Sequence, residues 1–533
     1  MASETANLSP TRSRLSLLLW CLIVLGVTFR FYNLDKKLFW HDETITMYHV
    51  SGYTMPELYD QLAIGHPLQF KECATFQRVN PERGPSFVLH SLSSNQSGHA
   101  PLFYLAAYFW AKTFGCAVGT MRYLPSLLSI FQLPCLYWLA MELFAEPLAA
   151  ELAVAFMALS PLQLLYAQQL REYSLFTTVI ILASAALLRA IRSPVLANWI
   201  LYLFSLVISL YTSVLSALVI IAHCAYLVVR FEIRWNRIMA CFLGSVLLSA
   251  VMFTPWLLEM IHNAQSAYLS VVWLTESVPT PVLVNTWFDN IARIFVDLGD
   301  NHLQLSNCLS AFVLLIVGYA AYEILHRGKE QSSLFVIALF LIPAIAFPLL
   351  DIFSGGQRSL YIKYMMPIPI AILLSVSYAL YLRQNTTTES VRTFWRGVAG
   401  YLLCCEIASC AVISQATIWT NKVVRHQDVV QVAAIINKDP HAMLISEFGK
   451  PLVRQTNLVQ MLVLSRLTRP ETYFELSGVP KLPTSLPGID HYYLFNPSPE
   501  SLDLLKAHGY TVAPVEKLDY FYLATLRTEN NHQ

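Results

Sequence analysis

The chain has 533 residues, of which 56% are hydrophobic and only 13% are charged, and its mean hydropathy is +0.49. This surplus of apolar side chains excludes a water-soluble globular protein and predicts an integral membrane protein whose main solvent is lipid. The formal net charge of +1 excludes nucleic acid as a partner, because a phosphate-binding surface needs a basic excess.

Apolar segments of spanning length fill most of residues 1–417. A transmembrane helix needs about twenty such residues. The stretch 197–230 is too long for one span, and the polar group Tyr211, Thr212 and Ser213 at its middle predicts two helices joined by a tight turn. The other predicted spans are 14–31, 122–144, 148–166, 173–191, 238–257, 306–326, 332–350, 362–382 and 397–417. We therefore predict an α-helical polytopic membrane protein with about eleven transmembrane helices.

The basic residues of the short loops predict the orientation, because such loops stay on the cytoplasmic side. Five basic clusters fall on one side of the predicted spans: Arg12/Arg14, Arg189/Arg192, Arg230/Arg234/Arg237, His326/Arg327/Lys329 and Arg383/Arg392/Arg396. The apolar stretch 100–114 is too short for a span, and counting it would invert every later loop, so we interpret it as an interfacial or re-entrant helix. The expected location is the plasma (inner) membrane, with a cytoplasmic N-terminus. The segments expected outside are 32–121, 167–172, 258–305, 351–361 and 418–533.

The last part of the chain changes character at residue 418. Short β-type runs at 442–445, 491–495 and 520–525 alternate with helical patterns at 428–437 and 501–508. This alternation predicts a small α/β domain outside the membrane. The chain is thus divided into a membrane domain, 1–417, whose first outer loop is 32–121, and a periplasmic domain, 418–533.

An acidic pair, Asp42 and Glu43, follows the first span by about ten residues and is preceded by interfacial aromatic residues. Two carboxylates at a membrane surface suit a substrate with a lipid tail. Asp42 is then a general base on an acceptor hydroxyl, while Glu43 orients it or helps to hold a divalent metal such as Mg or Mn, and any metal site is assigned to this pair. The alternative is a helix N-terminus whose first turn carries acids because the helix dipole favours them.

Two further residues of the first loop are candidates. His99 introduces the short apolar helix, and is either a site residue or a hydrogen-bonded structural histidine. Arg122 lies at a membrane boundary, where an unpaired cation is costly unless it meets an anion, and a phosphate is one natural partner.

The second outer turn forms a polar patch between two apolar helices. Tyr166, Gln168 and Arg171 are spaced so that they line one wall, offering hydrogen bonds to sugar hydroxyls and a planar fork for a phosphate. Glu172 belongs to the same candidate site. The alternative is that Arg171 and Glu172 simply pair with each other.

The third polar patch lies just before the tenth span. Gly355 and Gly356 expose backbone N–H groups, and Arg358, Ser359 and Lys363 add donors near a helix N-terminus, a combination that favours anion binding. The alternative is a flexible turn with a snorkelling Lys363.

Taken in order, these motifs resemble the GT-C superfamily of membrane glycosyltransferases. The resemblance is to the bacterial, family 39-like branch related to the protein O-mannosyltransferases and the lipid A aminoarabinose transferase. It covers roughly residues 14–380. The matching elements are Arg30 to Leu34, Trp40 to Glu43, His99 to Leu102, Gly115, Arg122, Ser160-Pro161 and Tyr166 to Ser174.

The resemblance implies an inverting transfer of a sugar from a polyprenyl-phosphate carrier to a lipid, protein or polysaccharide acceptor at the outer face. Asp42 is then the base, Glu43 its acidic neighbour, and Arg171 and Arg358 contact phosphate or sugar. The chain departs from the family pattern at Gln169, where Glu is common, so a required metal is doubtful. It also has Ala100 in place of a second Pro, and Lys363 in place of an Arg, which keeps the charge but loses the planar fork.

Two other functions fit a polytopic chain. A secondary transporter usually places broken helices and ionisable residues near the bilayer midplane, whereas the polar residues here collect at one face. A catalytically inactive scaffold with the same fold is the remaining alternative.

Overall fold

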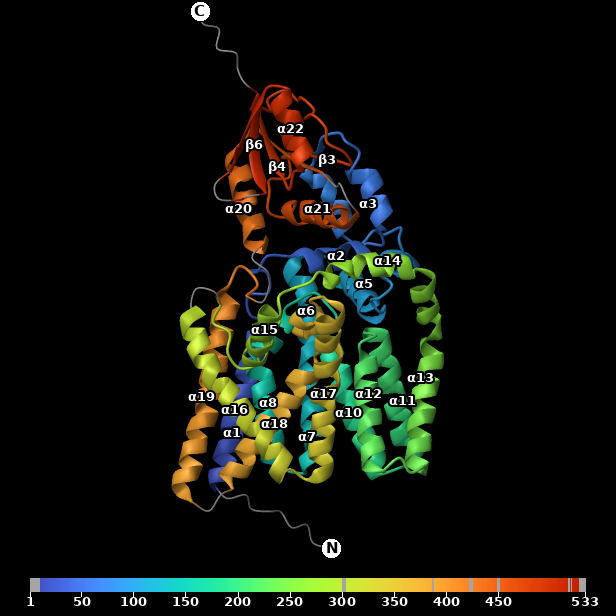
Figure 1. Ribbon diagram of the computed structural model, residues 1–533, viewed down its shortest axis with the longest axis vertical. Coiled ribbons are helices and arrows are strands. Elements are labelled where there is room, and N and C mark those ends of the chain that lie inside the picture. Colours follow the sequence, from blue (N-terminus) through green and yellow to red (C-terminus); the bar gives the residue numbers. More distant parts are fainter. Residues whose placement is uncertain are drawn as a thin grey trace, which may run out of the picture.

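The computed structural model describes residues 10–299, 303–385, 388–420, 425–447, 451–515, 518 and 520–526. A long helical bundle carries a small sheet domain at one end, and the first helix begins at the opposite end (Figure 1). The spanning helices are α1 (Pro10–Phe31), α6 (Val118–Ile130) continued by α7 (Gln132–Phe144), α8 (Pro147–Leu159) continued by α9 (Pro161–Ala167), α10 (Tyr173–Arg192), α11 (Leu196–Thr212), α12 (Ser216–Arg230), α13 (Arg237–His262), α16 (Leu303–Arg327), α17 (Glu330–Ser354), α18 (Pro367–Gln384) and α19 (Glu389–Gln415).

These helices occupy every predicted span, so the predicted fold class is confirmed. In the described part of the chain, seven helices are individually long and apolar enough to cross a membrane, and two bent helix pairs raise that number to as many as nine. Helices α11 and α12 are shorter apolar helices, as expected for the divided stretch 197–230. The chain is a multi-pass membrane protein.

Two bends depart from the simple pattern of spans. Helices α8 and α9 meet at 58° at Ser160-Pro161, where proline removes a backbone donor and begins a new helix. The predicted outer loop 258–305 contains the helices α14 (Ala264–Val271), η2 (Val272–Thr275) and α15 (Thr280–Ala292), with a 98° bend after Thr275. Figure 1 shows α14 lying across the sheet end of the bundle.

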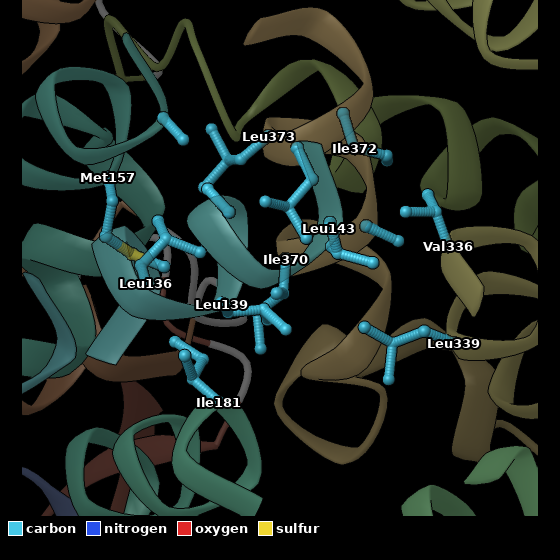
Figure 2. Close-up of a cluster of buried hydrophobic side chains, with 14 of the residues drawn as sticks. Leu136, Leu139, Leu143, Met157, Ile181, Val336, Leu339, Ile370, Ile372 and Leu373 are labelled. Atoms are coloured by element: carbon cyan, nitrogen blue, oxygen red, sulfur yellow. The ribbon is translucent and has the colours of Figure 1, made fainter. Parts of the chain in front are cut away.

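The core of the bundle forms where α7, α8, α10, α17 and α18 meet. Figure 2 shows leucines of α7 facing apolar residues of α17 and α18. Helices α1 and α8 approach closely at Gly26, because a Cβ there would lie 2.5 Å from the carbonyl oxygen of Ala158. This approach brings Arg30 to the backbone of α8, where its Nη2 donates to the Met157 carbonyl at 2.8 Å.

The loops that carry the predicted basic clusters, between α10 and α11, α12 and α13, α16 and α17, and α18 and α19, lie at the end opposite the sheet (Figure 1). Acidic residues of the helices pair with them there. Glu142 of α7 accepts from Arg192 at 2.8 Å, and Glu323 of α16 pairs with Arg383 and Arg327. The first loop, by contrast, lies at the sheet end and contains α2 (His41–Val50), α3 (Met55–Leu62), β1 (Leu68–Gln69), η1 (Phe70–Gln77), α4 (Pro85–Gln96) and α5 (Leu102–Phe114), the predicted short helix.

The C-terminal domain is an α/β domain built on a mixed sheet in the order β1-β3-β2-β4-β6-β5. Its elements are α20 (Arg425–Lys438), β2 (Ala442–Glu447), α21 (Pro451–Leu464), β3 (Tyr473–Ser477), β4 (His491–Phe495), α22 (Pro499–Ala507), β5 (Tyr510–Pro514) and β6 (Phe521–Leu526). Strand β2 runs parallel to β3 and β4. Strand β1 comes from the first loop, and Leu68 pairs antiparallel with Phe474. The sheet is therefore completed by the membrane domain.

Candidate active site

The N-terminus of α2 carries the predicted acidic pair. The Trp40 backbone N–H donates to Glu43 Oε2 at 3.3 Å, as in a capping box, and both acids lie in the first turn. Adjacent residues of a helix point about 100° apart, so Asp42 and Glu43 meet different partners.

Glu43 forms a fully buried ion pair with Arg122. Arg122 Nη2 lies 2.6 Å from Glu43 Oε2, and Nε donates to Oε1 at 2.8 Å. The Leu170 backbone N–H donates to Glu43 Oε1 as well. The other Arg122 N–H groups donate to the backbone carbonyls of Leu34, Lys37 and Leu38. All five N–H groups of Arg122 are used, which argues against the predicted phosphate contact. The Glu43–Arg122 pair instead holds the segment before α2 in place.

Asp42 instead faces Lys363, which lies on η5 (Ile362–Tyr364) between α17 and α18. Lys363 Nζ lies 3.2 Å from Asp42 Oδ2, and the two side chains are 10% and 18% exposed. Burial opposes a charge on Lys363, but Asp42, Tyr173 and Tyr364 together outweigh it and raise the pKa of the ammonium well above its usual value. The rings of Tyr173, Tyr361 and Tyr364 surround the ammonium at 5.3 to 5.6 Å. Lys363 is thus a charged residue at the site.

Arg171, Glu172 and His99 form a cluster beside Asp42. Glu172 Oε1 accepts from His99 Nδ1 at 3.1 Å, and its Oε2 lies 3.2 Å from Arg171 Nε. Burial raises the pKa of Glu172, but Arg171 and His99 outweigh it and lower that pKa to about 2. Arg171 Nη1 reaches the Asp42 carbonyl at 3.5 Å and Thr46 Oγ1 at 3.4 Å, both at the limit of a hydrogen bond. The pairing of Arg171 with Glu172 is confirmed, and the outer nitrogens of Arg171 have only weak partners.

Tyr166 at the end of α9 connects this site to an arginine that the sequence motifs did not indicate. Its ring packs edge-on against Tyr173 at 5.1 Å, and its hydroxyl lies within electrostatic range of Lys363, Arg293 and Asp42. Arg293 follows α15 and lines a small cavity of about 40 Å³ together with Asp289, Val296, Asp297, Gly299, Ser306, Asn307 and Ser310. No described residue forms an ion pair or a side-chain hydrogen bond with Arg293.

Gln168 tethers the first loop and does not face the site. Its Nε2 donates to the carbonyls of Phe29 and Tyr32, and its Oε1 accepts from Lys37 Nζ at 2.7 Å. All its hydrogen-bonding groups are used within the protein, which argues against the predicted contact with a sugar.

Lys37 is buried, and its pKa is strongly perturbed. Burial, with Arg122 adding to it, lowers the pKa of Lys37 to about 7 from 10.5. Below about pH 7 the folded and unfolded chains both carry this charge, so the cost of burying it is fully present. Between about pH 7 and 10.5 only the unfolded chain binds the proton, so folded-state stability rises with pH.

We therefore expect Lys37→Met to change the melting temperature in a pH-dependent way. Melting temperatures are measured in detergent micelles between about pH 7 and 10.5, the pKa values of Lys37 in the folded and unfolded chains. Over this range the difference between the variant and the wild type should fall steadily as the pH rises, because only the wild type becomes more stable. The matched control is Lys36→Met at the exposed neighbouring lysine, for which the difference stays flat. A flat difference for Lys37→Met itself would contradict the perturbed pKa.

The Gly355-Gly356 loop is organised by an internal carboxylate. Asp351 Oδ1 accepts from Arg358 Nη1 at 3.0 Å, and Oδ2 accepts from the Ser359 backbone N–H at 2.6 Å. Gly356 has a φ of 137°, and a Cβ there would lie 2.4 Å from Arg358 Nη1. The glycines therefore allow this close packing, and Arg358 and Ser359 of η4 (Arg358–Leu360) are anchored to Asp351. This anchoring argues against the predicted anion contact of Arg358 and Ser359.

The predicted metal pair does not fit a shared ion. Each Glu43 oxygen already accepts from Arg122 and from one backbone N–H, while Asp42 faces Lys363. A divalent cation between them would lie beside the Arg122 guanidinium. Within the part of the chain that the structure describes, no group of three His, Cys, Asp or Glu side chains is placed to hold a metal.

The structure thus sorts the predicted residues into three groups. It gathers Asp42, Lys363, Arg171, Glu172, His99 and Tyr166 at one site. It places Glu43, Arg122 and Gln168 in buried tethers, and Arg358 and Ser359 in the loop around Asp351. Arg293 and Lys37 are residues that sequence reasoning missed. The one sequence feature that could have indicated Arg293 is its place as a single cation directly after the apolar segment of α15.

A scan against protein-family models gives no match, and neither does a sequence search of curated proteins. Solved structures do match. ArnT from Cupriavidus metallidurans bound to undecaprenyl phosphate has a TM-score of 0.52 and 11% identity, covering 96% of this chain and 98% of that one. The same protein in the apo state gives 0.53 and 12%, over 95% and 97% of the two chains. An oligosaccharyltransferase from Archaeoglobus fulgidus in the apo form scores 0.48 at 11% identity, over 83% of this chain and 64% of that one.

The likeness to ArnT extends over nearly the whole of both chains, including the terminal domain. The TM-scores of 0.52 and 0.53 indicate a shared fold, and at 11% and 12% identity the comparison extends to the fold alone. By its architecture, this chain has the GT-C fold that its sequence motifs predict.

Proposed function

We propose that this chain transfers a sugar from a polyprenyl-phosphate carrier to a hydroxyl group of a lipid, protein or polysaccharide, with inversion and with Asp42 as general base. The observation that carries the proposal is the meeting of Asp42 with Lys363 and Arg171. These residues come from the first loop, the α17–α18 connection and the α9–α10 turn. The fold shared with ArnT, one structure of which holds undecaprenyl phosphate, supports the class of donor.

The proposed reaction balances with the residues present. Asp42 takes the proton of the acceptor hydroxyl as its oxygen forms a bond to C1 of the sugar. The bond from C1 to the phosphate oxygen breaks, and its electron pair leaves with the polyprenyl phosphate. Lys363 and the weakly bound outer nitrogens of Arg171 offer cations to that phosphate, and Arg293 adds a third from its cavity beside Tyr166. Glu172 and His99 hold Arg171 in place.

Inversion is supported by the number of available carboxylates. A double displacement with retention needs a second carboxylate as nucleophile. Glu43 is fully buried against Arg122, and Glu172 is held by Arg171 and His99. Asp42 pairs with Lys363, the cation assigned to the phosphate, so of these three acids we assign Asp42 to the acceptor side.

The proposed compartment follows from the basic loops. They lie at the end of the bundle opposite the sheet, and loops of this kind are retained in the cytoplasm. The site then works at the outer face of the plasma membrane, with the N-terminus inside and the C-terminal domain outside. A reporter fused after Gln533 should be active only in the outer compartment.

The experiment that tests the function compares cells with the gene, without it, and with only the Asp42→Asn variant. Mass spectrometry of outer-face glycans and glycolipids should show one sugar missing in the second and third strains. The missing sugar identifies the donor and the molecule that lacks it identifies the acceptor. Identical profiles in all three strains would refute the transferase and favour a transporter or an inactive scaffold.

Lys363 gives a second test of the site. Lys363→Gln removes the cation that faces both Asp42 and the proposed phosphate. A hydrogen bond to a charged group contributes about 1.5–3 kcal/mol, so we expect kcat/KM for the donor to fall roughly 10- to 100-fold. Lys363→Arg keeps the charge and should stay within a few-fold of the wild type. Steady-state kinetics in proteoliposomes decide this, with exposed Lys71→Gln as the matched control. An unchanged kcat/KM in Lys363→Gln would remove Lys363 from the site.

A further inference from the structure

The C-terminal domain contacts the segment that leads into α2. The Leu38 backbone N–H donates to the Thr417 carbonyl at 2.8 Å, and Trp419 Nε1 donates to the Leu38 carbonyl at 2.9 Å. Helix α21 packs against α2, and their apolar side chains share one core. The start of α2 is therefore held from the side of the domain as well as from the membrane bundle.

Arg466, just after α21, makes the most direct of these contacts. Its guanidinium lies over the ring of Phe39 at 4.3 Å, and its Nε donates to Gln77 Oε1. Gln77 Nε2 in turn donates to the Leu462 carbonyl at 2.8 Å and to Ser465 Oγ at 3.0 Å. Gln77 belongs to the first loop, so the loop and the domain hold Arg466 between them.

These contacts extend into a column of alternating cations and rings. The Arg122 guanidinium lies 5.6 Å from the centre of the Phe39 ring and 5.2 Å from that of Trp419, and Lys37 Nζ lies 5.7 Å from the centre of the Trp419 ring. Burial, with Arg122 and Arg78 adding to it, lowers the pKa of Arg466 to about 10. No described carboxylate forms an ion pair with Arg466. Its charge is therefore kept at this position at a cost, and the contact that it gains is with the residue three places before Asp42.

We propose that Arg466 is a positioning residue for the reaction: from the C-terminal domain it fixes Phe39 and thereby the direction in which the first turn of α2 presents Asp42 to Lys363. The inference rests on the proposed function, because it assigns the C-terminal domain a part in the chemistry of that site. Arg466 acts through Phe39 and Arg122, which also anchors Glu43. The rotation of α2 about its axis is thus set by the column and by the Glu43–Arg122 pair together.

The test replaces Arg466 with glutamine in the full-length chain. A misdirected base weakens the chemical step and leaves donor binding intact. We expect kcat to fall about 10-fold, with KM for the lipid-linked donor unchanged within about two-fold. Hydrogen exchange of the peptide covering residues 38–50 should become faster. Arg466→Lys, which keeps a cation over Phe39, should recover part of kcat. Arg469→Gln is the matched control, because the Arg469 side chain donates to the carbonyl of the domain's own Asp439.

A second experiment tests the same contact from the side of Phe39. Phe39→Leu removes the ring, and the double variant of Arg466→Gln with Phe39→Leu should lose no more kcat than the worse of the two single variants, because both remove one interaction. Additive losses, an unchanged kcat in Arg466→Gln, or faster exchange confined to the C-terminal domain would each overturn the positioning role. If Asp42→Asn also leaves transfer unchanged, the proposed function itself has failed. If Asp42→Asn abolishes transfer and Arg466→Gln does not alter it, only this inference has failed.

Discussion

Asp42→Asn is expected to lower the rate of sugar transfer about 100- to 10,000-fold, the range that a general base contributes. Asparagine has the same shape as aspartate, but its amide does not accept the acceptor's proton. It also loses the ion pair to Lys363, whose Nζ lies 3.2 Å from Asp42 Oδ2. Single-turnover transfer of a labelled sugar in proteoliposomes, at saturating donor and acceptor, measures the chemical step directly.

The control for this variant is Asp35→Asn, which neutralises an exposed carboxylate of the same loop. It should transfer at the wild-type rate, and both variants should melt within a few degrees of the wild type. A rate for Asp42→Asn within about three-fold of the wild type would show that Asp42 is not the base. Loss of the rate together with a large drop in melting temperature would assign Asp42 a structural role instead.

Glu43→Gln is expected to cost far more stability than activity per folded molecule. The variant leaves the Arg122 guanidinium, 1% exposed, without its counter-ion in a buried site. Breaking a buried ion pair on one side costs about 3–5 kcal/mol. A large drop in melting temperature in detergent micelles should follow. The folded fraction should still transfer sugar, with kcat lowered by about the 10-fold expected for a misdirected Asp42 and not by the loss expected for Asp42→Asn.

The chain offers a matched comparison in the Arg83–Glu57 pair. It has the same chemistry and an N···O distance of 2.9 Å, but its side chains are 19% and 35% exposed. Exposed pairs contribute about 0–1 kcal/mol, so Glu57→Gln should shift the melting temperature only slightly. Equal shifts in the two variants would contradict the structural assignment of Glu43.

Hydropathy and length were sufficient to predict the spans, because a bilayer imposes one strong requirement on every spanning segment. Local patterns also located β2, β4, β6 and the helices α20 and α22. Strand β1 was missed because two residues, Leu68 and Gln69, contain no pattern of their own, and only their partner β3 makes them a strand. Local periodicity does not predict which distant segments pair as strands.

The roles of the candidate site residues were harder to predict, because they depend on partners that lie far away in the sequence. Asp42 and Glu43 are neighbours in sequence, so the sequence does not say that Asp42 faces Lys363 while Glu43 faces Arg122. Arg358 was expected to bind an anion because two glycines and other donors lie beside it in the sequence. Nothing in that pattern shows that its partner is Asp351, which lies near the end of α17, just outside the predicted span 332–350. Each case depends on a contact between segments that only the folded chain brings together.

The strand pairing of Leu68 with Phe474 also bears on how the molecule is made. The ribosome releases the first loop long before β3 is synthesised, so the loop lacks its sheet partner, and Phe39 lacks Arg466, until the C-terminal domain has been made. The candidate site is consequently completed only once the C-terminal domain has been translated and has folded against the first loop. Truncated products still inserting into the bilayer would then lack a finished catalytic centre.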